Sequence, residues 1–175
     1  MKTKLCVVAV VALVVWGMKR YYADSRPDDL WWILSPTAKV VEATTGTTFT
    51  MSPGEGYVSR ERLFLIEKSC AGINFMIAAF GMSVFALFRR VGSAVSAAAV
   101  LGLGLAVSYA AAVLVNGARI TVAMWMAAHP IALSALTAAD VHRIEGIVVY
   151  FGGLALLYEC VHRVDRHVQP VRHQL

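Results

Sequence analysis

The chain has 175 residues, of which 58% are apolar and only 15% are charged. Soluble domains carry charged residues at about a quarter of their positions, so this composition excludes an ordinary soluble protein and favours a membrane protein. The formal net charge of +5 does not indicate nucleic-acid binding, because the basic residues form no stripe interleaved with aromatic residues.

Cysteine and histidine spacing predicts neither a disulfide framework nor a metal site. The three cysteines fall in or beside different apolar segments and form no CxxC pair: Cys6, Cys70 and Cys160. Three histidines near the C-terminus match no closed set of metal ligands: His162, His167 and His173. We therefore expect no metal and no cofactor, and we assign these histidines to a basic tail.

The first apolar run, residues 5–18, follows Lys2 and Lys4 and predicts a membrane helix. Such a run also resembles the hydrophobic part of a signal peptide. We favour a retained N-terminal anchor over residues 1–22, because no small-x-small cleavage site follows it. Aromatic residues typical of membrane interfaces come next: Tyr21, Tyr22, Trp31 and Trp32.

Residues 23–69 are predicted to form an extracytoplasmic segment. Pro27, Pro36 and Pro53 argue against a long helix in this segment. Residues with high β-propensity flank a turn signal at residues 53–56, and this pattern predicts a short β-hairpin.

Residues 70–160 are predicted to form a membrane helical bundle. Apolar spans run over residues 70–88 and 92–115, and a last span covers about 144–160. Together with the anchor, they predict an all-α polytopic fold of about four spans, followed by a cytoplasmic tail over residues 161–175.

Two details of this bundle follow from particular residues. His129 and Pro130 interrupt the apolar stretch 120–139, which we therefore expect to form two short interfacial or re-entrant helices. Small residues recur at a spacing of four and predict a close helix–helix interface: Ala98, Gly102 and Ala106.

Lysine and arginine residues in short loops predict that both termini are cytoplasmic. In a four-span arrangement, the N-terminal lysines, Arg89, Arg90 and the basic tail all lie on one side of the membrane. Lys19 and Arg20 oppose this orientation locally, but they begin a segment of about 50 residues, near the length at which loop charge loses its influence.

Three reactive side chains are predicted to meet at the opposite, extracytoplasmic face. Cys70 opens the second span, and His142 opens the fourth. Asn116 and Arg119 close the third span. A thiolate is a strong nucleophile, an imidazole within reach takes its proton, and a guanidinium stabilises the oxyanion of acyl transfer. Cys70, Arg119 and His142 are therefore candidate catalytic residues.

Supporting roles are open to several neighbours. Asn116 lies one helical turn before Arg119, where it is placed to orient the arginine or to bind substrate backbone. Three acidic residues are alternative partners of His142 or Arg119: Glu67, Asp140 and Glu145. Each has a purely structural reading as well, because charges at helix ends are usually solvated and arginine commonly reaches toward lipid headgroups.

The motifs around these residues resemble the exosortase/archaeosortase superfamily, and most closely the short type called exosortase K. The resemblance covers about residues 57–160 and rests on Cys70-Ala71-Gly72, on Asn116-x-x-Arg119 and on the later His142. It implies that Cys70 forms a thioester, that Arg119 stabilises the oxyanion and that His142 is the general base and acid. Two features depart from the family: the chain is short, and Ala71 stands where many relatives have serine.

The resemblance also implies a substrate and a location. The substrate would be a secreted protein with a C-terminal signal, consisting of a short motif, a transmembrane helix and a basic cluster. A cysteine peptidase or transpeptidase in the bacterial cytoplasmic (inner) membrane would cut it at the outer face and pass it to a surface acceptor. Because the chain is short, oligomerisation in the membrane lipid is one way to complete the groove for the substrate helix.

Other functions fit the same sequence. A non-enzymatic membrane scaffold or assembly subunit would use the polar groups only to bind a partner. A transporter or channel component would use Arg119 and His142 as an anion or proton site, although such groups should lie deep within spans. A thiol oxidoreductase fits less well, because no second cysteine is predicted on the outer face.

Overall fold

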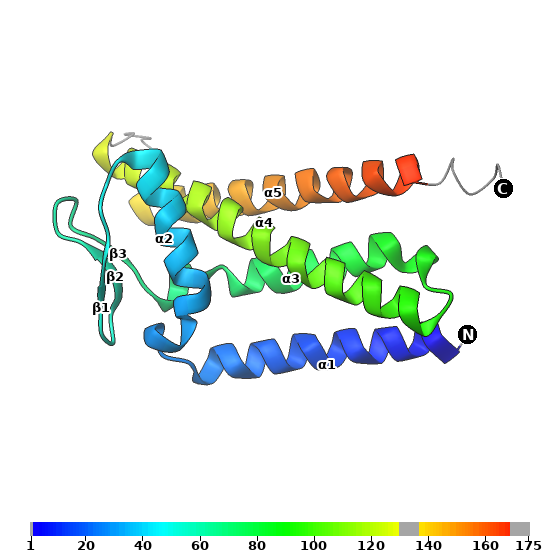
Figure 1. Ribbon diagram of the computed structural model, residues 1–175. Helices are drawn as coiled ribbons and strands as arrows, with labels where there is room; N and C mark the ends of the chain where they lie inside the picture. Colours follow the sequence, from blue (N-terminus) through cyan, green and yellow to red (C-terminus); the bar gives the residue numbers. More distant parts are fainter. Residues whose placement is uncertain (1, 130–136, 169–175) are drawn as a thin grey trace. The chain divides into compact units, whose positions relative to one another are not determined.

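Figure 1 presents the computed structural model, which describes residues 2–129 and 137–168. The side chains of Ala138, Ala139, His142, His167 and Val168 lie outside the described part. Four helical stretches are long and apolar enough to cross a membrane: Lys2–Asp24, Lys68–Arg90, Ala94–Ala128 and Arg143–Arg166. The predicted all-α class is confirmed, and each of the four predicted spans falls in a helical stretch long and apolar enough to cross, as in an integral membrane protein.

One compact unit combines α1 (Lys2–Asp24), α3 (Ile73–Leu87) and η3 (Phe88–Arg90) with the first half of α4 (Ala94–Ala128) and the last part of α5 (Ala138–Val168). Its core is apolar, and its members come from α1, α3, α4 and the residue that follows η3: Val7, Phe80, Val84, Leu87, Val91, Ala97 and Val100. An ion pair between Arg90 and Asp165 joins η3 to α5. The Arg90 Nη2 group also donates to the Asp165 carbonyl oxygen at 3.0 Å.

The predicted small-residue interface on α4 is wrong by part of a turn. Ala98, Gly102 and Ala106 are all exposed. The buried row at the same four-residue spacing is instead Val100, Gly104 and Ser108. A Cβ atom on Gly104 would lie 3.1 Å from the Val84 Cγ2 atom. Because α4 carries small residues on every side, spacing alone does not select the face that meets α3.

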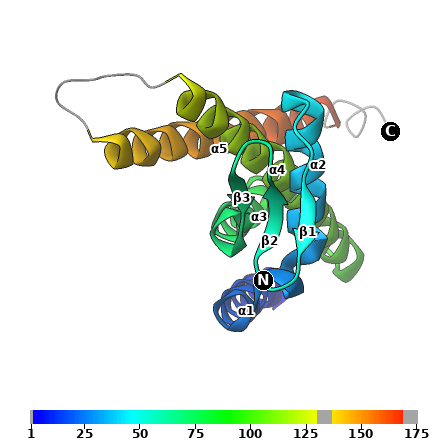
Figure 2. The same ribbon diagram turned by 90° about the vertical axis from the view of Figure 1, so that its left-hand side faces the viewer.

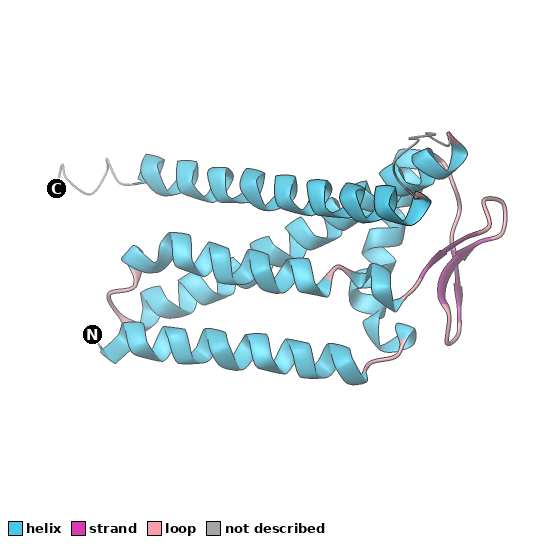
Figure 3. Ribbon diagram, turned by 180° about the vertical axis from the view of Figure 1, so that it is seen from behind, coloured by secondary structure: helices cyan, strands magenta, loops and turns pink. Residues whose placement is uncertain are grey.

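The second unit contains η1 (Pro27–Leu30), α2 (Trp31–Thr45), a small sheet, η2 (Lys68–Ala71) and the adjoining parts of α4 and α5. The sheet is antiparallel, with the order β1 (Thr50–Ser52), β2 (Gly56–Ser59), β3 (Phe64–Ile66). Figure 2 shows the three strands side by side, and Figure 3 distinguishes them from the helices. The predicted hairpin is therefore present, and β3 extends it by pairing Leu65 with Val58.

The expectation that prolines prevent a long helix before the sheet is wrong. Helix α2 has 15 residues and continues through Pro36. One face of the helix and its preceding turn is almost completely buried: Leu30, Ile33, Leu34, Thr37, Ala38 and Val41. Burial of this face offsets the single backbone hydrogen bond that proline removes. The helix ends at Gly46, whose φ of 68° is left-handed.

Helix α4 differs most from the prediction. It does not end near Val115 but continues without a break to Ala128, so the first of the two short interfacial helices is part of α4. The helix stops just before His129 and Pro130, because a proline disfavours helical geometry in the preceding residue. Residues 130–136 lie outside the described part, so the second short helix is not addressed. Asn116 and Arg119 consequently lie inside a helix.

Candidate functional site

Cys70 is held at the entrance to α3 by its local backbone. The residue lies in η2 and is half-buried. Its N–H donates to the Glu67 carbonyl oxygen at 2.9 Å, and the Ser69 hydroxyl donates to the Glu67 carboxylate at 2.8 Å. The Ser69 hydroxyl also lies 3.8 Å from the Cys70 sulfur. Glu67 therefore accepts hydrogen bonds from two residues of the turn that carries the cysteine, Ser69 and Cys70.

Asn116 connects this turn to the two long helices of the unit. Its side chain is fully buried in α4. The amide nitrogen donates to the carbonyl oxygen of Cys70, and the amide oxygen accepts from the Tyr150 hydroxyl at 2.8 Å. One buried amide thus uses its donor and its acceptor to join η2, α4 and α5, and it fixes the backbone of Cys70 from outside the cysteine's own segment.

Gly72 makes room for this asparagine. It ends η2 with a left-handed φ of 66°, a conformation that residues with a side chain adopt only at a cost. A Cβ atom at this position would also lie 3.1 Å from the Asn116 Cγ atom. The glycine two residues after Cys70 therefore has a double function: it turns the chain into α3 and lets Asn116 reach the Cys70 carbonyl.

Arg119 lies against the face of α5 that carries Gly146 and Tyr150. Its guanidinium carbon is 5.2 Å from the centroid of the Tyr150 ring, within the range of a cation–π interaction. A Cβ atom on Gly146 would lie 2.9 Å from the Arg119 Nε atom. The absence of a side chain at Gly146 is thus what lets the arginine approach α5. Tyr150 thus makes two contacts: its hydroxyl donates a hydrogen bond to Asn116, and its ring packs against the Arg119 guanidinium.

His142 is placed by its backbone alone, because its side chain is outside the described part. Residue 142 lies in the second turn of α5, four residues before Gly146 and eight before Tyr150. Residues at four-residue intervals share a face of a helix. Position 142 therefore lies on the face of α5 that receives Arg119.

Glu145 and Asp140 differ in their surroundings. Glu145 is buried, with 8% of its surface exposed, and both Glu145 and Cys70 lie near enough to Tyr150 to act electrostatically on its hydroxyl. Asp140 instead accepts hydrogen bonds from the Thr137 hydroxyl at 2.6 Å and the Thr137 N–H at 3.2 Å. Its own N–H donates to the Thr137 hydroxyl, so the two residues form a capping box.

These hydrogen bonds hold the pKa of Asp140 below its ordinary value, because they favour the charged carboxylate. The described contacts of Asp140 thus stabilise the start of α5. Among the supporting residues, Asn116 and Glu145 lie at the described cluster, whereas Asp140 caps the helix that carries position 142.

Sequence reasoning missed Tyr150 and Gly146. Both fall in an apolar run, where a tyrosine and a glycine are unremarkable in a membrane helix. Their spacing of four and eight residues from His142 was the available signal. It acquires meaning only when Arg119 and Asn116 are known to pack against that face.

Chemically, the cluster presents a half-buried thiol and a fixed guanidinium within one hydrogen-bonded framework. Among the described residues, no three or more histidine, cysteine, aspartate or glutamate side chains are grouped to hold a metal ion. Comparisons of this chain with protein-family models, curated proteins and solved structures gave no match.

Proposed function

We propose that the protein is an exosortase-like cysteine peptidase or transpeptidase of the bacterial cytoplasmic membrane. The observation that carries the proposal is the pair of hydrogen bonds of Asn116, to the Cys70 carbonyl oxygen and from Tyr150. Through Tyr150 this link extends to Arg119. The Cys70 motif and the Asn116-x-x-Arg119 motif, which are far apart in the sequence, thus contact one framework, and position 142 lies on the face of α5 that receives Arg119.

In the proposed reaction, the Cys70 thiol gives its proton to His142, and the sulfur attacks the scissile carbonyl carbon. Arg119 stabilises the resulting oxyanion. As the C–N bond breaks, His142 returns the proton to the leaving amine, and a thioester remains on Cys70. An acceptor hydroxyl, amine or water then attacks the thioester and gives its proton to His142; the C–S bond breaks, and the Cys70 thiolate that leaves takes that proton back from His142.

The proposed substrate is a secreted protein with a C-terminal transmembrane signal, cut at the extracytoplasmic face. The length of α4 supports a site near a membrane surface. Its 35 residues correspond to about 52 Å at 1.5 Å per residue, against about 30 Å of hydrocarbon. We place the start of the crossing at Ala94, from which about 20 residues suffice to cross; in this placement Asn116 and Arg119 follow the hydrocarbon even though the helix continues.

The test follows processing of the cell's own secreted proteins that end in an apolar span and a basic cluster. We expect Cys70→Ala to abolish their processing, because no other group supplies the nucleophile. Arg119→Ala should slow it by about 100- to 1,000-fold, the usual effect of removing an oxyanion donor. The wild-type protein should carry a hydroxylamine-labile adduct on the Cys70 peptide, detected by mass spectrometry.

The matched controls are Cys6→Ala and Cys160→Ala, which alter the two exposed cysteines and should leave processing at the wild-type level. Membrane levels of all variants are compared by immunoblot. Normal processing by Cys70→Ser, with no labile adduct in the wild type, would instead support the non-enzymatic scaffold.

A further inference from the structure

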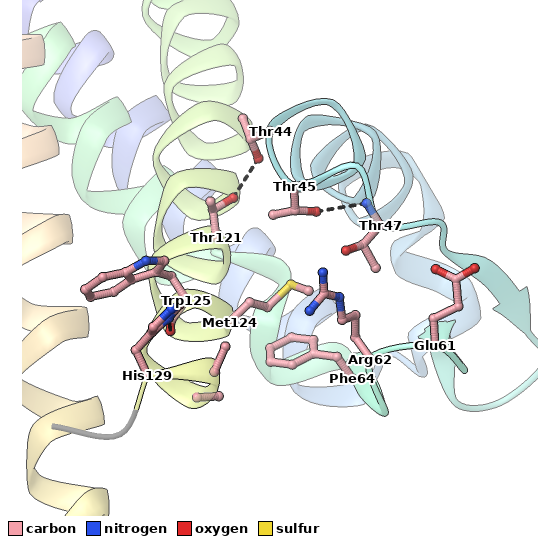
Figure 4. Close-up of a pocket in the computed structure, with 12 residues that line it drawn as sticks. Thr44, Thr45, Thr47, Glu61, Arg62, Phe64, Thr121, Met124, Trp125 and His129 are labelled. Atoms are coloured by element: carbon pink, nitrogen blue, oxygen red, sulfur yellow. Dashed lines mark hydrogen bonds between the residues drawn. The ribbon is translucent and has the colours of Figure 1, made fainter. Parts of the chain in front are cut away.

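A separate cavity of about 520 Å³ lies in the second unit, among the end of α2, the β2–β3 turn and the last turns of α4. This volume is typical of small-molecule sites. Figure 4 shows its lining residues: Thr44, Thr45, Thr47, Glu61, Arg62, Phe64, Thr121, Met124, Trp125, Ala127, Ala128 and His129. Below it is called the threonine pocket.

The threonine pocket lies on a different face of α4 from the cysteine cluster. Successive residues of an α-helix are about 100° apart around the axis. Thr121, Met124 and Trp125 therefore share one face, and Arg119 lies on nearly the opposite one. A ligand in the threonine pocket would therefore lie on the other side of α4 from Arg119 and would not contact the cysteine cluster through this helix.

The walls of the threonine pocket are fixed relative to each other. The hydroxyls of Thr44 and Thr121 form a hydrogen bond of 2.8 Å between α2 and α4. One turn earlier on both helices, a Cβ atom on Gly117 would lie 2.5 Å from the Val40 Cγ1 atom, which shows how closely the two backbones approach. A cavity formed by such rigid contacts exists before a ligand arrives, which lowers the entropic cost of binding.

Arg62 supplies a positive charge to this cavity. Its guanidinium points into the space between the end of α2 and Met124 (Figure 4). It forms no hydrogen bond or ion pair with any residue that the structure describes. The hydroxyl of Thr47, a buried residue, likewise has no hydrogen-bond partner in the described part. A guanidinium and a hydroxyl with free donors are suited to a tetrahedral oxyanion.

The remaining lining residues restrict the ligand further. Phe64, Met124 and Trp125 add apolar surface, which favours an amphiphile over a small hydrated ion. Glu61 contributes one negative charge, which disfavours multiply charged anions. With the crossing of α4 placed from Ala94 as proposed above, its last turns and the 57% exposed Trp125 lie at headgroup level or beyond.

We propose that the threonine pocket binds a singly charged phosphate group, with Arg62 as the principal donor. The phosphate comes from an anionic lipid headgroup or from a soluble phosphate compound. The apolar wall receives the glyceride or another apolar portion. This site is independent of Cys70 chemistry, so it remains testable whether or not the protein is a peptidase.

The test uses the purified full-length protein in maltoside micelles and isothermal titration calorimetry. The probes are short-chain phosphatidylglycerol, inorganic phosphate and a diacylglycerol with the same acyl chains. We expect saturable binding of phosphatidylglycerol, and Arg62→Gln should weaken it at least about tenfold through loss of charge-assisted hydrogen bonds. Binding of inorganic phosphate alone, with the same Arg62 dependence, would assign the soluble source.

Arg60→Gln is the matched control, because Arg60 lies in the same turn, is exposed and does not line the pocket. It should bind like the wild type. Circular dichroism and thermal unfolding without ligand establish that both variants are folded. Equal weakening by the two substitutions, equal binding of the phosphate-free diacylglycerol or no binding of either phosphate probe would overturn the proposal.

Discussion

Asn116 is the residue on which the geometry of the candidate site depends. A buried amide is costly unless its polar atoms are paired, and here the nitrogen and the oxygen each have a partner on a different element. An apolar residue of similar size would fill the space but would leave the Cys70 carbonyl and the Tyr150 hydroxyl without this partner. The asparagine therefore fills space in the core and also fixes the positions of η2 and α5 relative to α4.

Gly72 offers a direct test of that arrangement. Gly72→Ala should cost about 1–2 kcal/mol of stability through its left-handed backbone, and it should also push Asn116 away from Cys70. We expect processing activity to fall more than stability alone explains. Stability is measured by unfolding in detergent, and activity by the substrate-processing assay.

Gly46→Ala is the matched control, since Gly46 has nearly the same φ, 68° against 66°, but nothing within 4 Å of its added Cβ atom. It should lose similar stability and keep its activity. Equal activity losses in the two variants would mean that backbone strain, and not contact with Asn116, explains the effect at Gly72.

At the scale of the elements, long apolar windows predicted the four spans, because the bilayer requirement of about 20 apolar residues leaves few alternatives. The end of α4 was not predictable in the same way. The sequence predicts a helix end at Asn116 and Arg119, whereas the two residues lie inside the helix, where partners on η2 and α5 accommodate them. Helix α2 was missed because the cost of Pro36 is visible in the sequence, but the burial that offsets it is not.

The start of α5 depends on the charge of Asp140. Because folding lowers its pKa, the carboxylate contributes stability above the unfolded-state pKa, and this contribution is lost as the pH falls through the lower folded-state value. Hydrogen exchange of the first turn of α5 should therefore be constant near neutral pH and should accelerate, after correction for intrinsic rates, below about pH 4.

Asp140→Asn should show faster exchange already at neutral pH and little further change on acidification. An unchanged exchange profile in this variant would show that the Thr137–Asp140 capping box does not stabilise the helix start. Neither result depends on the proposed catalytic role of the neighbouring His142.

For the whole molecule, the charges in short loops predict the orientation in the membrane, that is, which ends of the helices face the cytoplasm. The four helices themselves do not determine this orientation. We expect Cys70 to face outward. In a variant with Cys6→Ser and Cys160→Ser, a membrane-impermeant maleimide should label Cys70 in intact cells. The control replaces all three cysteines with serine and adds Gln174→Cys in the tail, which should react only after the cells are permeabilised. The reverse pattern would invert the topology.

The sequence identifies several residue types that the candidate site uses, but it does not predict which of these residues contact one another. Cys70, Arg119 and His142 stood out because reactive or charged groups beside apolar runs are costly and tend to be functional. Gly146 and Tyr150 did not, because their importance arises only from packing against residues of another helix. Local patterns in the sequence thus identify candidate side chains, and tertiary packing decides which of them share a site.

The links through Asn116 also determine when the cluster forms during synthesis. Asn116, which donates to the Cys70 carbonyl oxygen, lies 46 positions after Cys70 in the sequence. Tyr150, which donates to Asn116, lies 34 positions after Asn116. A nascent chain that has emerged only as far as α3 therefore carries the thiol without its framework. Cys70 acquires its final surroundings only once the last helix has been made and inserted. A ribosome-bound intermediate that lacks this helix therefore cannot yet form the complete cluster around the thiol.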